Sequence, residues 1–139
     1  ELPVAPAPAF QYVPVTIHER LAFVSGQLPR HGEALVTGKV GTDVDRERAR
    51  DAARLCILQG LACLNQSLGS LDKVDRILKI TGFVASAPGF NLQPRVIDAA
   101  SELLVQIFGD MGKHARSAVG VAELPRNAAV EIEMIVALR

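Results

Sequence analysis

Apolar residues recur with helical spacing in two stretches of the chain. Between Asp45 and Leu68, and again between Pro94 and Phe108, apolar or small side chains return every three or four positions, as they do on the inner face of a helix. Thr42 or Asp43 can cap the start of the first stretch, and Gly69 can end it. The pattern therefore predicts two helices, each with one buried face.

Five further stretches carry the pattern of β-strands. RLAFVSGQLP, from Arg20, predicts a strand that Pro29 ends, and ALVTGKVG predicts a second strand after the turn RHGE, so that the two form a hairpin. Residues rich in β-branched side chains predict a strand over 77–86, and two more are expected over 116–122 and 129–138, joined by the turn LPRN. The order β-β-α-β-α-β-β predicts an α+β fold, a single β-sheet with two helices packed on one face.

The last two predicted strands indicate which face of the sheet the helices cover. One side of 129–138 is entirely apolar and is expected to face the helices, while the other side carries Glu131 and Glu133. In 116–122 the alternation groups Arg116 with Ala118, and we expect both to share the second face with the glutamates. Because that face mixes small and apolar residues with isolated charges, we expect it to pack against another subunit, with the charges lining a cleft.

Arg116 stands alone in the run HARSAVGVAELP. A guanidinium is costly to bury unless a carboxylate or phosphate balances its charge. Glu131 or Glu133 could supply that partner within the protein, which makes a structural ion pair one interpretation. The other is a site that holds an anionic small molecule, and the pattern alone leaves both open.

Composition narrows the class of protein. The chain has 139 residues, expected to form one domain over 1–139 with an extended arm over 1–14, and 49% of its residues are hydrophobic. Fifteen basic residues balance fifteen acidic ones, so the charge pattern of a nucleic-acid binder is missing. Arg46, Arg50 and Arg54 could form a basic stripe for RNA, but a solvated helix face is the favoured interpretation.

Cysteine usage and hydrophobic runs indicate the compartment. Cys56 and Cys63 lie two turns apart on one predicted helix, too far for a disulfide, so we expect reduced core cysteines and a cytoplasmic protein. No apolar run is long enough for a membrane span, and the start ELPVAPAPAF lacks the pattern of a signal peptide. No cluster of cysteines or histidines has the spacing of a zinc site, so no metal is expected.

Four segments together resemble the RidA/YjgF family, whose older name is "endoribonuclease L-PSP". They are FVSGQLP, LGSLDKVDRILKITGFV, HARSAVGVAELP and VEIE, and the similarity runs from Tyr12 to Leu138. HARSAVG followed by VEIE, with Arg116 and Glu131 fifteen residues apart, is the specific part. The resemblance implies a chorismate-mutase-like fold and a homotrimer with clefts between subunits. It also implies hydrolysis of reactive 2-imino acids to 2-oxo acids and ammonia, without a cofactor.

The resemblance also implies roles for particular residues. Arg116 matches the arginine that binds the substrate carboxylate, a role that suits the fork of a guanidinium, and Glu131 matches the residue that orients or activates the attacking water. Tyr12 matches the tyrosine of the cleft. Ser25 and Gly26 match the strand whose backbone contacts substrate.

Two departures mark a distinct branch of that family. Ala118 replaces the family cysteine, which keeps the backbone N–H expected to contact the carboxylate but removes the thiol. The family's asparagine on the second helix has no clear equivalent, and Asn91 lies out of register. His114 is expected to be a surface or interface residue rather than a base.

Three functions are compatible with these observations. The first is a cofactor-free imine deaminase that uses Arg116 and Glu131. The second is a non-catalytic trimer that binds a small 2-imino or 2-oxo carboxylate for sensing or regulation. The third is a ribonuclease, which the neutral charge and the scarcity of aromatic residues disfavour. The presence of Glu131 favours the first, because carboxylate binding alone does not require it.

Overall fold

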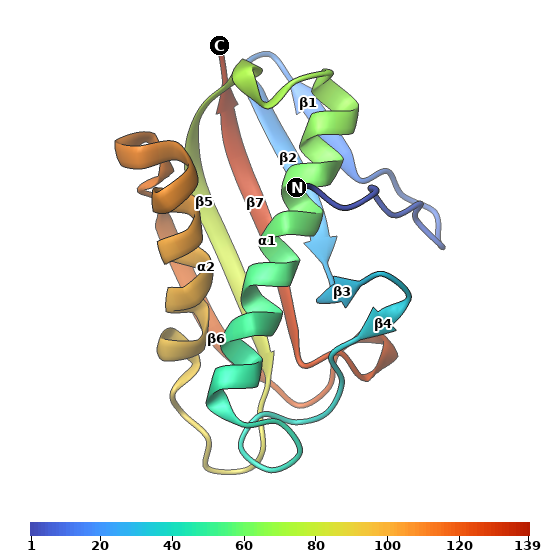
Figure 1. The fold of residues 1–139 in the computed structure, drawn as a ribbon, viewed down its shortest axis with the longest axis vertical. Coiled ribbons are helices and arrows are strands. Elements are labelled where there is room, and N and C mark those ends of the chain that lie inside the picture. Colours follow the sequence, from blue (N-terminus) through green and yellow to red (C-terminus); the bar gives the residue numbers. More distant parts are fainter.

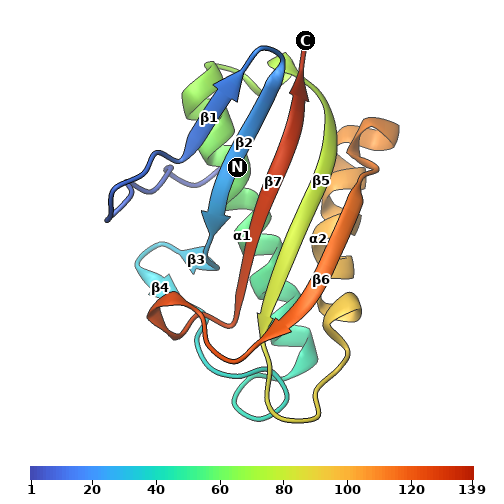
Figure 2. The same cartoon turned by 180° about the vertical axis from the view of Figure 1, so that it is seen from behind.

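One five-stranded sheet carries two helices on a single face. The computed structural model describes residues 1–139. Helices α1 (Arg46–Leu68) and α2 (Gln93–Phe108) lie side by side across the sheet (Figure 1), and the view from behind shows the opposite face without helices (Figure 2). The predicted α+β fold is confirmed. The strands lie in the order β1 (Val15–His18), β2 (Leu21–Gln27), β7 (Val130–Leu138), β5 (Val74–Ala85) and β6 (Ala115–Val121).

The connections follow from how the strands pair. β1 with β2, β2 with β7 and β7 with β5 are antiparallel, whereas β5 and β6 are parallel. Parallel neighbours need a long crossover, which α2 supplies here. β6 therefore forms an edge of the sheet directly beside the helix that precedes it in the chain.

Helix α1 begins and ends at residues suited to caps. The Asp45 side chain accepts a hydrogen bond from the Arg48 N–H at 2.8 Å, and Gly69 ends the helix with a φ of 85°, a conformation that favours glycine. Gly69 was predicted correctly, but the expected cap at Thr42 or Asp43 is wrong. The Asp43 carboxylate instead accepts from the Lys39 N–H at 3.0 Å and closes a turn before the helix.

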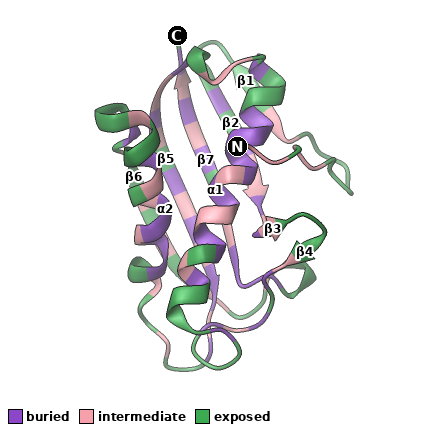
Figure 3. Ribbon diagram, viewed as in Figure 1, coloured by how far each residue is buried: buried purple, intermediate pink, exposed green.

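The core lies between the sheet and the two helices. Buried residues face each other along β5, β7, α1 and α2 (Figure 3). The apolar side of β7 is buried as predicted, through Val130, Ile132, Met134, Val136 and Leu138. Two glycines allow close approach: a Cβ on Gly60 would lie 2.5 Å from Met134 Cε, and one on Gly82 would lie 2.5 Å from Ile97 Cδ1.

A hairpin forms around the predicted RHGE turn, but the prediction that the strand from Arg20 belongs to it is wrong. β2 pairs with β1 through the turn at Glu19 and Arg20, and β7 occupies its other edge. The RHGE turn instead joins two very short strands, β3 (Arg30–His31) and β4 (Ala34–Leu35), in a separate sheet. Pro29 explains the difference, since a residue without an N–H cannot continue the β2 ladder.

Three short 3-10 helices complete the chain. They are η1 (Leu71–Lys73), η2 (Gly109–Gly112) and η3 (Pro125–Asn127). The last contains the predicted LPRN turn, in which Arg126 and Asn127 both have φ near 57°. Neither α-helix combines the length and apolar character that crossing a membrane requires.

Candidate functional site

Glu131 stands on the face of the sheet that the helices leave open. It alternates in β7 with the buried residues Val130 and Ile132, which face the core. Its carboxylate lies over β2, where the register with β7 shifts between Val24 and Gln27. A Cβ placed on Gly26 would come within 2.8 Å of Glu131 Oε2. The glycine therefore makes the room in which the carboxylate sits.

The segment before β1 runs along the same part of β2. Ser25 donates through its Oγ to the Val13 carbonyl at 2.8 Å, and its N–H donates to the Pro14 carbonyl at 2.9 Å. These bonds hold Tyr12, which is half exposed, one residue from a direct contact with Ser25. The structure thus brings Ser25, Gly26 and Glu131 together at one place on the sheet, and hydrogen bonds to Ser25 hold the backbone next to Tyr12.

The acidity of Glu131 is shifted by its surroundings. Partial burial raises the pKa of this carboxyl above its ordinary value of 4.5, and the negative charge of Glu133 raises it further. Both factors disfavour the ionised form. A carboxyl group with a raised pKa can exchange protons with a bound molecule closer to neutral pH than an ordinary glutamate can.

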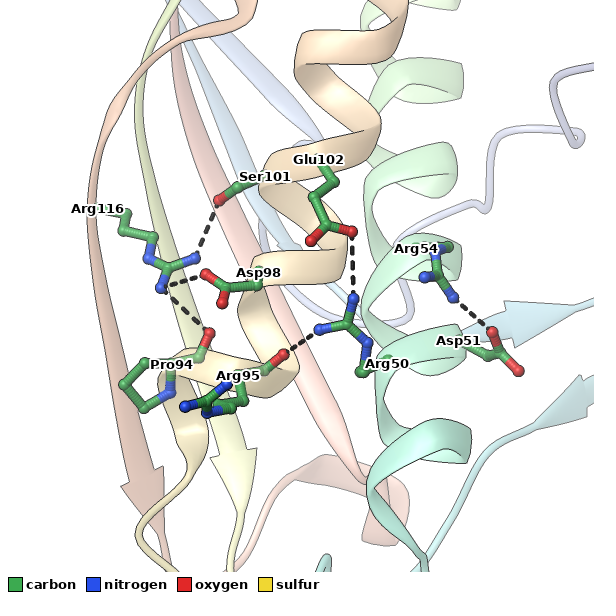
Figure 4. A network of polar contacts seen from close by, with 9 residues as sticks. All are labelled: Arg50, Asp51, Arg54, Pro94, Arg95, Asp98, Ser101, Glu102 and Arg116. Atoms are coloured by element: carbon green, nitrogen blue, oxygen red, sulfur yellow. Dashed lines mark hydrogen bonds and ion pairs between the residues drawn. The ribbon is translucent and has the colours of Figure 1, made fainter.

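Arg116 lies in β6, and its guanidinium points to α2 rather than to the open face (Figure 4). Nη1 donates to Ser101 Oγ at 3.1 Å, and Nη2 donates to the Pro94 carbonyl at 3.1 Å. Nη2 also forms an ion pair with Asp98 Oδ1 at 2.9 Å. The side chain is 23% exposed, so its charge is held largely within the protein.

The expectation that Arg116 shares a face with the glutamates is wrong. Arg116 pairs with Ile80 and Glu131 pairs with Phe83, and residues three apart in one strand point to opposite faces. The alternation along β6 was predicted correctly, but Arg116 and Ala118 face the helices and Val119 faces the open side, the reverse of the expectation. β6 is an edge strand, so Val119 can remain 43% exposed while Arg116 finds polar partners on α2.

Ala118 lies on the helix side of β6 together with Arg116. It pairs with Gly82 of β5 and packs against the core. Two residues further on, a Cβ on Gly120 would lie 2.6 Å from Gln93 Nε2 of α2. The small residues of β6 therefore let the start of α2 approach this edge of the sheet.

Sequence reasoning missed the polar residues that surround Arg116. Asp98 and Ser101 lie three positions apart on α2 and so share one side of the helix. His114 extends the network: its Nε2 lies 2.9 Å from Ser101 Oγ and its Nδ1 lies 2.6 Å from the Gly112 carbonyl. The signal available in the sequence was that Asp98 and Ser101, at helical spacing, lie between the apolar positions of the predicted helix.

Two of the arginines on α1 that the sequence singled out form ion pairs. Arg50 forms an ion pair with Glu102 at 3.1 Å, and Arg54 forms one with Asp51 at 2.6 Å (Figure 4). The Arg54 side chain, 38% exposed, agrees with the favoured interpretation of a solvated helix face, whereas the Arg50 side chain is only 18% exposed and contacts α2. Cys56 and Cys63 are both buried and free, as predicted, and burial raises the pKa of each thiol.

One large cavity lies away from all the predicted site residues. It has a volume of about 860 Å³ and lies between residues 1–6, the β3–β4 turn and α1. Its walls include Arg30, His31, Leu55 and Gln59. No group of three or more His, Cys, Asp or Glu side chains lies where it could hold a metal ion. The chemistry-bearing residues therefore lie in two places, around Glu131 and around Arg116.

Comparisons with known proteins agree on one family. The family model described as Endoribonuclease L-PSP matches residues 3–138. Protein TCP17 of Trypanosoma cruzi is 42% identical over 99% of this chain and 88% of its own length. The 2-iminobutanoate/2-iminopropanoate deaminase of Dermatophagoides farinae is 31% identical over 98% of this chain and 92% of its own length.

Solved structures separate into near and more distant neighbours. Protein Atu1372 of Agrobacterium tumefaciens, described as having unknown function, is 49% identical over 95% of this chain and 85% of its own, with a TM-score of 0.92. A putative endoribonuclease of Shewanella oneidensis is 29% identical over 99% of this chain and 92% of its own, with a TM-score of 0.96. The YjgF gene product of E. coli is also 29% identical, over 97% and 94%, but its TM-score is 0.68. Although the two proteins are equally identical in sequence, the backbone of this chain is more similar to that of the Shewanella protein than to that of the E. coli protein.

Proposed function

Because the chain belongs to the Endoribonuclease L-PSP family, to which the YjgF and RidA proteins also belong, we propose that it hydrolyses reactive 2-imino acids. The products are 2-oxo acids and ammonia, and enamine tautomers enter the same reaction. The observation that carries the proposal is Glu131, a half-buried carboxyl with a raised pKa that lies directly over Gly26. The deaminase relative, 31% identical across nearly the whole chain, supports this reaction class.

Glu131 handles the proton in each half of the reaction. An iminium carbon is already electrophilic, so water attacks it as the Glu131 carboxylate takes a proton from that water. The addition product carries a hydroxyl and an amine on one carbon. Protonated Glu131 then returns its proton to the amine nitrogen, and the C–N bond breaks as ammonia leaves. The hydroxyl gives its proton to the ionised Glu131 as the carbonyl forms. The raised pKa suits a group that must both accept and donate.

The remaining residues bind the substrate. In this proposal Tyr12 lines the cleft, and the backbone of Ser25 and Gly26 contacts the substrate beside Glu131. Arg116 binds the substrate carboxylate, with the Ala118 N–H as a second donor. Because Arg116 and Glu131 lie on opposite faces of one sheet, a site that contains both takes them from two protomers, as in a homotrimer with clefts between subunits.

The exposed apolar residues support such an assembly. Leu21, Phe23 and Val119 are 37%, 43% and 43% exposed, and each lies on the open face of the sheet, as register and alternation show. Large apolar side chains gathered on one face of a sheet are typical of a surface that packs against another subunit. Glu131 stands among them, so a partner that covers this face also encloses the carboxylate.

An imine-trapping assay tests the proposal. A threonine dehydratase generates 2-iminobutanoate in place, and semicarbazide traps whatever the protein has not hydrolysed. We expect the wild-type chain to suppress semicarbazone formation, and we expect Glu131→Gln and Arg116→Ala to lose that effect while remaining folded. Glu47→Gln, which neutralises an exposed carboxylate on α1, is the matched control and should behave as wild type.

Two results would contradict the proposal. A wild-type protein that leaves semicarbazone formation unchanged with several 2-imino acids is a binding protein rather than a deaminase. A wild-type protein that runs as a 15 kDa monomer at assay concentration, yet is fully active, excludes a site shared by two protomers.

A further inference from the structure

We propose that Asp98 is a specificity-determining residue that competes with the substrate's carboxylate for Arg116. The inference rests on the proposed function, in which Arg116 binds that carboxylate. It concerns a residue that the sequence patterns did not single out, and it predicts that this chain binds small carboxylates less tightly than the same chain without the Asp98 charge.

The contact with Asp98 lies at the part of the guanidinium that a carboxylate needs. A carboxylate binds arginine at two points through an edge of the fork, and each such edge of the guanidinium includes Nη2. In this structure Nη2 already donates to the Pro94 carbonyl at 3.1 Å and lies 2.9 Å from Asp98 Oδ1. A second carboxylate therefore cannot bind at two points unless one of these groups moves away.

Asp98 is the partner that can move. The Pro94 carbonyl belongs to the backbone of the first turn of α2, so its position is fixed by the helix. The Asp98 side chain is 48% exposed, against 23% for Arg116. A half-exposed side chain can rotate into water at small cost. A substrate carboxylate would thus take the place of Asp98 rather than that of Pro94.

The other end of the guanidinium is held by a chain of hydrogen bonds. A carbonyl only accepts, so the contact between His114 Nδ1 and the Gly112 carbonyl assigns the proton to Nδ1 in the neutral ring. His114 Nε2 then accepts from the Ser101 hydroxyl at 2.9 Å, which leaves the Ser101 Oγ lone pairs for Arg116 Nη1 at 3.1 Å. Arg116 is consequently fixed in place before any ligand arrives.

The charge of Asp98 has a second effect on anionic ligands. With Asp98 in contact, the pair carries no net charge, and an approaching carboxylate meets a negative oxygen beside the guanidinium. Both effects lower affinity for any ligand that relies on a carboxylate, and neither acts on an imine that lacks one. Asp98 therefore reduces the preference of the site for ligands with a carboxylate over imines that lack one.

Binding of 2-oxobutanoate, which does not react, measures the competition directly. We expect Asp98→Asn to bind it roughly threefold to tenfold more tightly than wild type in calorimetry or NMR titration, because a partly exposed ion pair no longer opposes it. The matched control is Glu102→Gln, which removes an equal charge from the same helix but from the ion pair with Arg50. It should leave the affinity unchanged.

The double variant Asp98→Asn/Arg116→Gln shows whether the gain passes through Arg116, and we expect it to lose the gain. Asp98→Ser repeats the test if Asp98→Asn melts at a lower temperature. Affinity in Asp98→Asn that equals or falls below wild type overturns the inference, as does an equal gain in Glu102→Gln. The imine-trapping assay is read separately: a wild-type chain without deaminase activity ends the proposed function, while tighter binding in Asp98→Asn still supports the competition.

Discussion

Gly26 and Glu131 touch across the junction of β2 and β7, where a Cβ on the glycine would lie 2.8 Å from Glu131 Oε2. The φ of Gly26 is not in the left-handed region, so alanine is tolerated by the backbone and the conflict falls on the carboxylate alone. The identity of residue 26 therefore controls the position of the proposed proton acceptor.

The first prediction concerns this contact. Gly26→Ala should displace the Glu131 carboxylate and reduce the rate of imine hydrolysis by about tenfold to a hundredfold, since small displacements of a reacting group are costly. The melting temperature should change little, because the residue lies outside the core. The imine-trapping assay and a thermal melt measure the two effects. Full activity in Gly26→Ala would show that the reaction does not depend on the position that the Glu131 carboxylate holds beside Gly26.

The second prediction concerns the pH dependence of activity. Burial raises the pKa of Glu131, and the charge of Glu133 raises it further. Neutralising that neighbour in Glu133→Gln should lower the pKa of Glu131, so the acidic limb of the pH–rate profile should move to lower pH. A profile measured for both proteins over the same range tests this. If the acidic limb lies at the same pH in both proteins, a group other than Glu131 controls the rise of the rate with pH.

The third prediction concerns stability. The folded protein holds the Glu131 proton more tightly than the unfolded chain does, so stability is lost as pH rises from the ordinary value of 4.5 through the raised pKa. Glu131→Gln cannot ionise and escapes this loss. The variant should therefore be more stable than wild type at neutral pH, and the difference should shrink below pH 4.5. Urea denaturation at both pH values is the measurement.

The fourth prediction concerns the packing of α2 on the sheet. Gly82→Ala places a methyl group 2.5 Å from the expected position of Ile97 Cδ1 in a fully packed core. Overpacking of this kind should lower the free energy of unfolding by about 1–3 kcal/mol. Gly82→Ala/Ile97→Val should recover part of the loss. Equal stability of Gly82→Ala and wild type would show that the helix shifts freely.

Hydrophobic periodicity was sufficient to predict the two helices and the buried side of β7. Val130, Ile132 and Met134 alternate so regularly with polar residues that only one orientation buries them. The same reasoning failed for β6, because Arg116 and Val119 exchange the positions that a central strand would give them. At an edge strand, exposure of an apolar residue costs less, and partners on a neighbouring helix decide the orientation.

Pairing between strands was harder to predict than the strands themselves. Alternation in residues 21–27 identifies a strand but contains no information about which neighbour takes each edge. The competition between β1, β4 and β7 for β2 was decided by Pro29 and by contacts far apart in the sequence. Asp98 was missed for a related reason: its significance appears only when α2 and β6 are placed side by side.

β6 pairs with β5 in parallel, so the length of the segment between α2 and β6 fixes the register of β6 in the sheet. Residues 109–114 alone set how far β6 has advanced when it enters the sheet beside α2. A change of one residue in that length would invert every side chain of β6, taking Arg116 from Asp98 on the helix side to the open face of the same subunit, where Glu131 stands. The length of this short connection thus determines whether Arg116 contacts α2 or lies on the same face as Glu131 of its own subunit.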